Sequence, residues 1–223
     1  MGFTPAALCY LRPHMRTPKV PLEKFEQRRA ELGEATLQTL AALGYARTSL
    51  REIAQNSAFS HGVLHYYFQD KTDLILCSVR QYKARCITRY DGIVAQAQGA
   101  AQLQQAFLTL LGDTLRDEAP LHRLWYDLRA QAMFEAAFRD DVAVIETSLE
   151  KMVWNVIARL AELAGGTEDL PSPALAYATV DGLFQQALLK HLSGDETAIT
   201  ALQRDVAGLL ARLLPALAAN PAP

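Results

Sequence analysis

The sequence of 223 residues has few cysteines and no long apolar run. Cys9, Cys77 and Cys86 are an odd number without CxxC or CxxxC spacing, which argues against a disulfide framework and against a zinc site made of cysteines. Because no stretch of about 18 consecutive apolar residues is present, no transmembrane helix is expected. Glycine (12 residues) and proline (10 residues) are too rare for a low-complexity linker. These absences favour a globular protein of a reducing cytoplasm.

Catalytic signatures are missing as well. The sequence has no HExxH, GxSxG, P-loop or GxGxxG motif. Among its five histidines only His61 and His65 have the i,i+4 spacing that places two metal ligands on one helical face. We therefore expect a protein that is not an enzyme and that carries no cofactor and no metal.

The composition is globular, but the charge is distributed unevenly. Hydrophobic residues make up 50% of the chain and charged residues 21%, and the formal net charge is −2. Residues 1–90 contain 13 Lys and Arg against 7 Asp and Glu, a net charge of +6, whereas residues 91–223 contain 9 against 17, a net charge of −8. This asymmetry indicates a polyanion-binding module joined to a different body, although ordinary solvated charge is the simpler alternative.

The first part of the chain divides into a leader and a series of short helices. Residues 1–21 contain four prolines and lack the long hydrophobic segment of a signal peptide, so we expect a disordered leader. The apolar periodicity of residues 22–43 predicts a helix. Ser49 and Glu52 have capping-box spacing and predict a second, short helix. A third short helix is expected from Ser60.

The rest of the chain has the periodicity of longer helices. A fourth helix is expected from Asp70 onward, with Cys86 on its apolar stripe as a buried residue and Cys77 on the opposite face as a candidate for exposure. About five further helices are predicted, in segments 99–115, after Pro120, 140–164, after Pro173, and 199–217. No segment has the alternation of a strand. The sequence therefore predicts an all-α fold.

The order of these helices indicates a DNA-binding unit. Three short helices over residues 22–71 predict a helix-turn-helix domain, and residues 72–223 then form a separate helical domain. In a helix-turn-helix, the recognition helix enters the major groove while the helix before it crosses the phosphate backbone.

The segment from Ile53 to Leu74 resembles the TetR family of bacterial transcriptional regulators. Its residues that match the pattern of this family are Ile53, Ala54, Ser60, Gly62, Leu64, Tyr67, Phe68, Lys71 and Leu74. The resemblance covers about residues 25–75 and implies a helix-turn-helix protein that represses transcription from a palindromic DNA operator. Two later stretches, 121–133 and 180–184, are similar to the choline-regulator-like branch of the family.

Three positions depart from the pattern of the family. Ala58 replaces the glycine of the turn, and Phe59 replaces the valine that follows it. Because alanine tolerates a positive φ poorly, a slightly reshaped turn is expected, with Phe59 filling the core between the helices. His65 stands where a tyrosine is common, so the operator sequence cannot be transferred from relatives.

The candidate DNA-binding residues lie in two groups. Hydroxyl, guanidinium and backbone N–H groups at the start of the second helix can bind phosphate, and the third helix presents groups that reach base edges. The resemblance adds a phosphate-binding pair, Tyr67 and Lys71. The full set is Thr48, Ser49, Arg51, Ser60, His61, Gly62, Val63, His65, Tyr66, Tyr67 and Lys71.

Other residues near this unit are assigned to the core or to solvent. Leu50, Ile53, Ala54, Leu64 and Phe68 are expected in the core. Lys24, Arg28 and Arg29 are candidates for further phosphate contacts from the first helix. Lys83, Arg85 and Arg89 are expected on a solvated face.

The helical domain is expected to bind a ligand and to dimerise. The resemblance implies a homodimer through the last two helices, and Ala176, Ala187 and Ala207 would permit close packing there. The candidate ligand-binding residues are large or polar groups on the body helices: Trp125, Tyr126, Arg129, Met133, Phe134, Trp154, Phe184 and Gln185. Asp127, Glu135 and Asp181 would favour a cation. The alternative is a ligand-independent DNA-binding or architectural protein with a filled C-terminal core.

Overall fold

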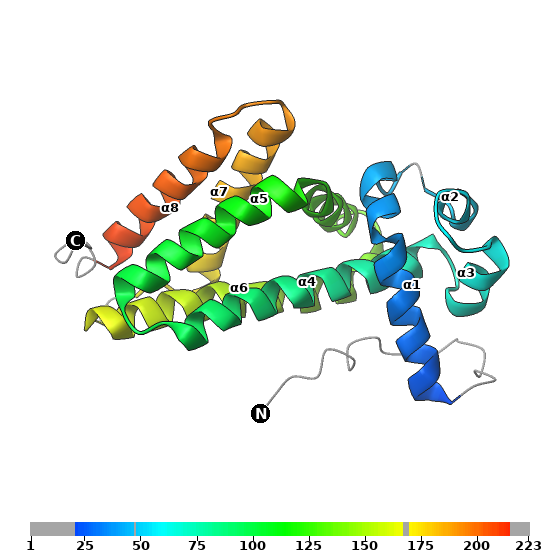
Figure 1. The fold of residues 1–223 in the computed structure, drawn as a ribbon, viewed down its shortest axis with the longest axis horizontal. Helices are drawn as coiled ribbons and strands as arrows, with labels where there is room; N and C mark the ends of the chain where they lie inside the picture. Colours follow the sequence, from blue (N-terminus) through cyan, green and yellow to red (C-terminus); the bar gives the residue numbers. More distant parts are fainter. Residues whose placement is uncertain (1–20, 47, 167–169, 215–223) are drawn as a thin grey trace. The chain divides into compact units, whose positions relative to one another are not determined.

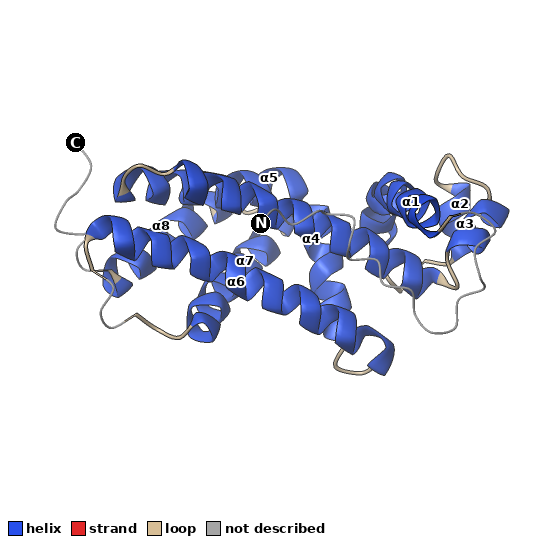
Figure 2. Cartoon of the chain, turned by 90° about the horizontal axis from the view of Figure 1, so that it is seen from below, coloured by secondary structure: helices blue, strands red, loops and turns tan. Residues whose placement is uncertain are grey.

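The computed structural model describes residues 21–46, 48–166 and 170–214, and these residues form helices and loops without a strand (Figure 1, Figure 2). The elements are α1 (Leu22–Leu43), α2 (Leu50–Gln55), α3 (His61–Tyr67), α4 (Lys71–Gln96), α5 (Ala100–Gln131), the 3-10 turn η2 (Ala136–Phe138), α6 (Arg139–Ala164), α7 (Pro173–Leu192) and α8 (Ala198–Leu213). None of the described helices is long and apolar enough to cross a membrane. The predicted all-α fold is confirmed. Apart from Pro21, the predicted leader lies outside the described residues.

The helix starts follow the capping signals of the sequence. The Ser49 hydroxyl accepts a hydrogen bond from the Glu52 backbone N–H, and the Ser60 hydroxyl accepts one from the Val63 N–H. These bonds satisfy N–H groups that have no partner within the helix. Gly44 ends α1 with φ of 75°, a left-handed conformation that favours glycine.

The break that the sequence predicts near Pro120 is confirmed. The element labelled α5 consists of two helical segments that meet at a kink. Pro120 lacks a backbone N–H, and the kink falls at Glu118, whose φ of −124° and ψ of 15° are not helical. The proline therefore separates the two helical segments, as predicted.

The chain packs as two compact units. The first contains the described residues up to Arg85 together with Arg123–Ile145, and the second contains Cys86–His122 and the described residues from Glu146 onward. This division by packing cuts across α4 and α5. The predicted functional division between residues 71 and 72 remains a prediction.

The core of the first unit is built around the three N-terminal helices and the first half of α4. α1, α2 and α3 pack against one another, burying Leu32, Leu40, Ile53, Leu64 and Phe68. Gly33 lets α1 approach α4 closely, since a Cβ atom there would lie 3.3 Å from Ser78 Oγ and 3.5 Å from Cys77 Sγ. Cys77 is consequently only 2% exposed, and its predicted exposure is wrong.

Arg29 joins three helices of this unit. It is buried on α1, and its guanidinium donates to both carboxylate oxygens of Asp73 on α4, at 2.8 and 3.0 Å. The same group donates to the Tyr67 backbone oxygen at the end of α3, at 2.5 Å. The expectation of a phosphate contact from Arg29 is wrong, because the side chain is buried and paired with Asp73 inside the protein. Sequence reasoning missed this role because Asp73 lies far along the chain.

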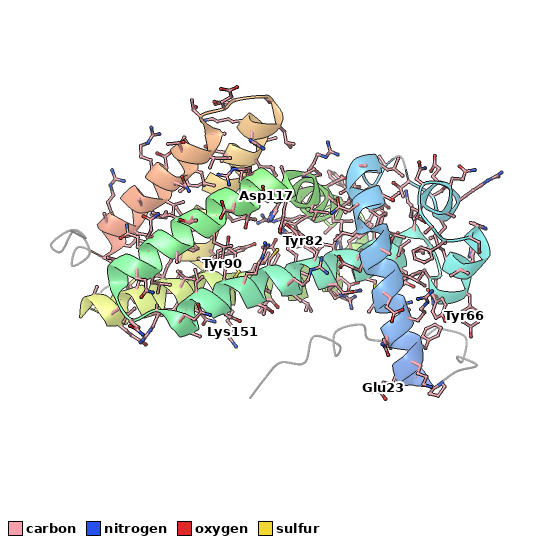
Figure 3. All side chains as sticks on the ribbon, viewed as in Figure 1. Glu23, Tyr66, Tyr82, Tyr90, Asp117 and Lys151 are labelled. Atoms are coloured by element: carbon pink, nitrogen blue, oxygen red, sulfur yellow. The ribbon has the colours of Figure 1, made fainter. Side chains whose placement is uncertain are left out.

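The second unit has its own core. Leu103, Phe107 and Leu115 of α5, and Val156 and Leu160 of α6, are fully buried. Tyr90 on α4 faces α5, and its ring lies 5.8 Å from that of Phe107 (Figure 3). Burial raises the pKa of the Tyr90 hydroxyl, so this side chain stays neutral in the core. α7 and α8 pack against each other.

Replacing Arg29 tests whether it holds the N-terminal unit together. We expect Arg29→Met to lower the free energy of unfolding by about 3 kcal/mol, because it leaves the nearly buried Asp73 carboxylate without its partner. Urea unfolding followed by circular dichroism measures the change. Arg28→Met is the matched control: Arg28 pairs with Glu31 on the exposed side of the same helix, and its loss is expected to cost less than about 1 kcal/mol. Equal effects of the two variants would contradict the assignment.

Candidate nucleic-acid interface and ligand region

The start of α2 presents two of its three predicted phosphate-binding side chains to solvent. Ser49 and Arg51 are exposed. Thr48 is buried, and its hydroxyl donates to the Gly44 backbone oxygen. In this conformation the Thr48 hydroxyl serves to hold the turn between α1 and α2, and it is not presented to a partner.

One face of α3 is exposed and the other is anchored in the core. His61, Gly62, His65 and Tyr66 are exposed, whereas Leu64 is fully buried. The rings of His61 and His65, one helical turn apart, lie 4.6 Å from each other. Ser60 caps the helix and is itself exposed. The predicted recognition residues therefore form one continuous surface on a helix that the core holds in place.

Aromatic contacts orient the end of α3. The Phe25 ring on α1 lies 5.0 Å from the Tyr67 ring and 6.0 Å from the Tyr66 ring. Tyr66 is 47% exposed and projects from α3 (Figure 3). Because two χ angles leave tyrosine few rotamers to lose, a ring held in this way can contact DNA at a low entropic cost.

Lys71, the first residue of α4, already has a partner within the protein. Its ammonium group lies 4.2 Å from the centre of the Tyr45 ring and donates to the Tyr45 backbone oxygen at 3.2 Å. The Tyr45 hydroxyl in turn donates to the Glu135 carboxylate at 3.2 Å. Burial raises the pKa of the Tyr45 hydroxyl. Lys71 is half-buried, so part of its positive charge remains available at the surface.

The remaining basic residues divide between solvent and core. Lys24 and Arg28 are exposed on α1, as a phosphate contact requires. Arg85 and Arg89 are exposed and paired with Glu34 and Glu118. The expected solvated position of Lys83 is wrong.

Lys83 is only 3% exposed. Its ammonium group lies 5.3 Å from the ring centres of Tyr82 and Trp125, so two aromatic faces stabilise its charge. No pattern in the sequence indicates this burial, since a lysine in a helical pattern usually faces solvent.

The candidate ligand-binding residues do not share one environment. Trp125 and Phe184 are buried, and Tyr126, Arg129 and Trp154 are half-buried. Met133 and Phe134 are 71% and 81% exposed in the turn after α5, and Gln185 is exposed on α7. Exposure of this kind does not fit the wall of an apolar cavity, so the described conformation gives these three assignments no support, and they stay predictions.

Two acidic residues expected to favour a cation have structural partners. The Asp127 carboxylate accepts a hydrogen bond from the Tyr45 backbone N–H at 3.1 Å, and Glu135 accepts one from the Tyr45 hydroxyl. These bonds fasten the loop after α1 to residues of the first unit. Asp181 lies on α7 in the second unit and is half-buried.

Large apolar side chains are exposed on α7. Ala176 and Ala187 of this helix are buried within the chain, so they are not available for the close packing against a second copy that the sequence predicted. Leu175, Leu189 and Leu192 are instead 59%, 62% and 42% exposed on the same helix. Ala207 of α8 is half-buried.

A capped, exposed recognition helix packed on two supporting helices, followed by long helices, defines a helix-turn-helix DNA-binding protein. Comparison with known proteins agrees. Residues 32–76 match the tetR family of bacterial regulatory proteins. The chain is 30% identical over 196 residues to the HTH-type transcriptional regulator BetI of Paraburkholderia phymatum, covering 86% of this chain and 96% of that protein. The BetI regulator of Burkholderia thailandensis is 26% identical over 187 residues, covering 83% and 94%. The chain belongs to the TetR family of bacterial transcriptional regulators.

Solved structures show the same fold at lower sequence identity. A TetR-family regulator from Rhodococcus sp. superposes with a TM-score of 0.66 at 20% identity, covering 84% of this chain and 98% of that one. The regulator FadR of Bacillus subtilis, solved in complex with stearoyl-CoA, has a TM-score of 0.66 at 16% identity, covering 82% and 97%. These structures show that the fold is shared, and it is membership of the TetR family that makes the chain a DNA-binding transcriptional regulator.

Proposed function

We propose that this regulator is a cytoplasmic homodimeric repressor that leaves a palindromic operator when a small molecule binds its helical domain. The observation that carries the DNA-binding part is the exposed face of α3, where His61, Gly62, His65 and Tyr66 lie on a helix anchored by buried Leu64. A face of this kind fits the major groove, where side chains read base edges.

The proposed contacts divide by chemistry. Ser49 and Arg51 at the start of α2, with Tyr67 and Lys71, bind phosphates and set the register of the protein on DNA. Ser60, His61, Gly62, Val63, His65 and Tyr66 form the surface that reads the bases, and the Val63 side chain can contact a thymine methyl group. We omit Thr48, because its hydroxyl is buried.

The exposed leucines of α7 support a dimer. Leu175, Leu189 and Leu192 would expose a row of large apolar side chains to water in an isolated protomer, which a second copy would cover. A two-fold dimer places its two recognition helices in successive major grooves about 34–36 Å apart and therefore reads a palindromic site.

A buried unsatisfied donor favours a ligand over a filled core. The indole N–H of Trp125 is buried and has no hydrogen-bond partner among the described residues. Leaving such a donor unsatisfied costs about 1–3 kcal/mol, which an acceptor on a bound ligand would recover. The ligand releases DNA only if it binds the DNA-free conformation more tightly than the DNA-bound one.

Substitutions that remove a phosphate contact and substitutions that remove a base contact are expected to change the affinity for DNA in different ways. We expect Arg51→Gln to weaken binding to operator and random DNA alike and to lower the salt slope by about one, because one phosphate contact is lost. Tyr66→Ala is expected to weaken operator binding about 10-fold or more while leaving random DNA unaffected. Fluorescence anisotropy over a salt series, on a site selected from a random DNA pool by the wild-type protein, measures both effects.

Lys151→Gln is the matched control, because it removes one positive charge from an exposed position on α6. It should change neither affinity nor salt slope. An Arg51 variant that behaves like the Lys151 variant would exclude Arg51 from the interface, and a Tyr66 variant that retains full operator affinity would exclude the proposed reading face.

The dimer interface is tested by placing charge on α7. We expect the double variant Leu175→Glu, Leu189→Glu to be a monomer, because carboxylates cannot be buried there without a partner. Light scattering after size-exclusion chromatography gives the mass, and the wild-type protein should contain two chains. Val144→Glu, at an exposed apolar position on α6, should stay dimeric. A double variant that remains a dimer would place the interface elsewhere.

A further inference from the structure

Three side chains that can bind a metal meet in the second unit. Cys86 lies on α4, and Glu118 and His122 lie on α5. One ligand atom from each lies within 4.8 Å of the other two, and Cys86 Sγ is 3.9 Å from a Glu118 carboxylate oxygen. Cys86 is 3% exposed and His122 is 8% exposed, so a thiol and an imidazole are held out of water beside a carboxylate.

The kink in α5 and the packing of neighbouring rings position these groups. Glu118 is the residue with non-helical dihedrals, and Pro120 lies between it and His122. The His122 ring packs against the Phe184 ring at 4.7 Å, which fixes its plane. Because the ligands come from two helices, the spacing of cysteines and histidines along the sequence could not reveal the cluster.

A cationic group already occupies the cluster. The Arg89 guanidinium donates to both Glu118 oxygens at 2.6 and 2.8 Å and lies 3.3 Å from Cys86 Sγ. Its hydrogen bonds to Glu118 raise the pKa of Arg89. The Arg89 side chain is 38% exposed, so it can turn into solvent when another cation takes its place.

The donor set matches a borderline divalent ion. Thiolate, imidazole and carboxylate are the ligands of Zn²⁺, which in many sites takes three protein ligands and leaves the fourth position to water. With bonds of about 2.0–2.3 Å, tetrahedral Zn²⁺ separates its ligand atoms by roughly 3.3–3.8 Å. The present separations exceed this by no more than about 1.5 Å, a distance that small side-chain movements cover.

We propose that Cys86, Glu118 and His122 form a site for Zn²⁺ or a chemically similar divalent ion, and that this ion is an effector of the regulator. On binding, the Cys86 thiol releases its proton to solvent and the Arg89 guanidinium leaves Glu118. The charge within the site stays balanced. Before binding, Arg89 neutralises Glu118, and after binding the Cys86 thiolate and the Glu118 carboxylate neutralise the divalent ion.

The effector role rests on the proposed function, whereas the metal site does not. Cys86 lies on α4, the helix that begins at Lys71 next to the recognition helix. With a helical rise of about 1.5 Å per residue, Cys86 lies roughly 22 Å along the helix from Lys71. Drawing Cys86 toward Glu118 and His122 therefore acts on a helix that is continuous with the DNA-binding unit.

Metal titration of the full chain tests the site directly. In a non-thiol reductant, Zn²⁺ is titrated in competition with a chromophoric chelator, and Co²⁺ is used as a spectroscopic probe. We expect one ion per chain, with the thiolate-to-metal charge-transfer band of Co²⁺ and the intense visible bands of a tetrahedral site. Cys86→Ser should remove the charge-transfer band, and His122→Gln should weaken binding at least tenfold.

Substitutions of Arg89 and of Glu118 are expected to change the affinity for Zn²⁺ in opposite directions. Arg89→Met should tighten Zn²⁺ binding, because it removes the competing cation, whereas Glu118→Gln should weaken it. A merely structural role for the Arg89–Glu118 pair predicts no tightening. Cys77→Ser is the control for a buried thiol elsewhere, and the double variant His61→Gln, His65→Gln removes the exposed histidine pair on α3; both should retain the ion.

Zinc binding that is unchanged in the Cys86 and His122 variants, with unchanged thermal unfolding, would overturn the site. The effector role is tested by operator affinity with and without Zn²⁺, which should differ at least tenfold for wild type and not for His122→Gln. Equal affinities with the site filled would overturn the effector role alone. Failure of the wild-type protein to select any DNA would refute the proposed function, while the metal titration would still decide the site.

Discussion

The bidentate pair between Arg29 and Asp73 is the interaction on which the DNA-binding unit depends. A buried guanidinium needs an anionic partner, and here the two terminal nitrogens of Arg29 hold α4 and the end of α3 against α1. The exposed face of α3 is therefore fixed by contacts made on its opposite side. The start of α2, for which we propose phosphate contacts, is fixed by the Ser49 cap and the buried Thr48 hydroxyl.

Local signals made the N-terminal helices predictable. The caps at Ser49 and Ser60 and the apolar stripe of α1 act within a few residues, so the sequence alone locates those helices. The resemblance to TetR regulators rested on the same short segment, and the comparisons confirm it. Arg29 and Asp73 lie far apart in the sequence, so no periodic pattern links them. For this reason the sequence predicts a phosphate contact for Arg29, although its role is structural.

The helical body was harder to interpret because burial there depends on which helices meet. Cys77 faces α1 rather than solvent, and Lys83 is buried on two aromatic rings. The break near Pro120 was predictable, because proline lacks the backbone N–H that a continuous helix needs, and two helical segments meet there at a kink. The same kink carries Glu118 toward Cys86 and Arg89, an arrangement that spacing along the chain does not encode.

The central claim is that the exposed face of α3 reads a specific DNA sequence, and competition binding tests it most directly. Fluorescence anisotropy would follow the wild-type protein on labelled DNA selected from a random pool, in a large excess of unlabelled random DNA. The account predicts that binding survives the competitor, saturates at two chains per site and maps to a palindrome. Binding lost in proportion to the competitor, with no sequence enriched by selection, would contradict it, because electrostatic attraction alone would then explain the affinity.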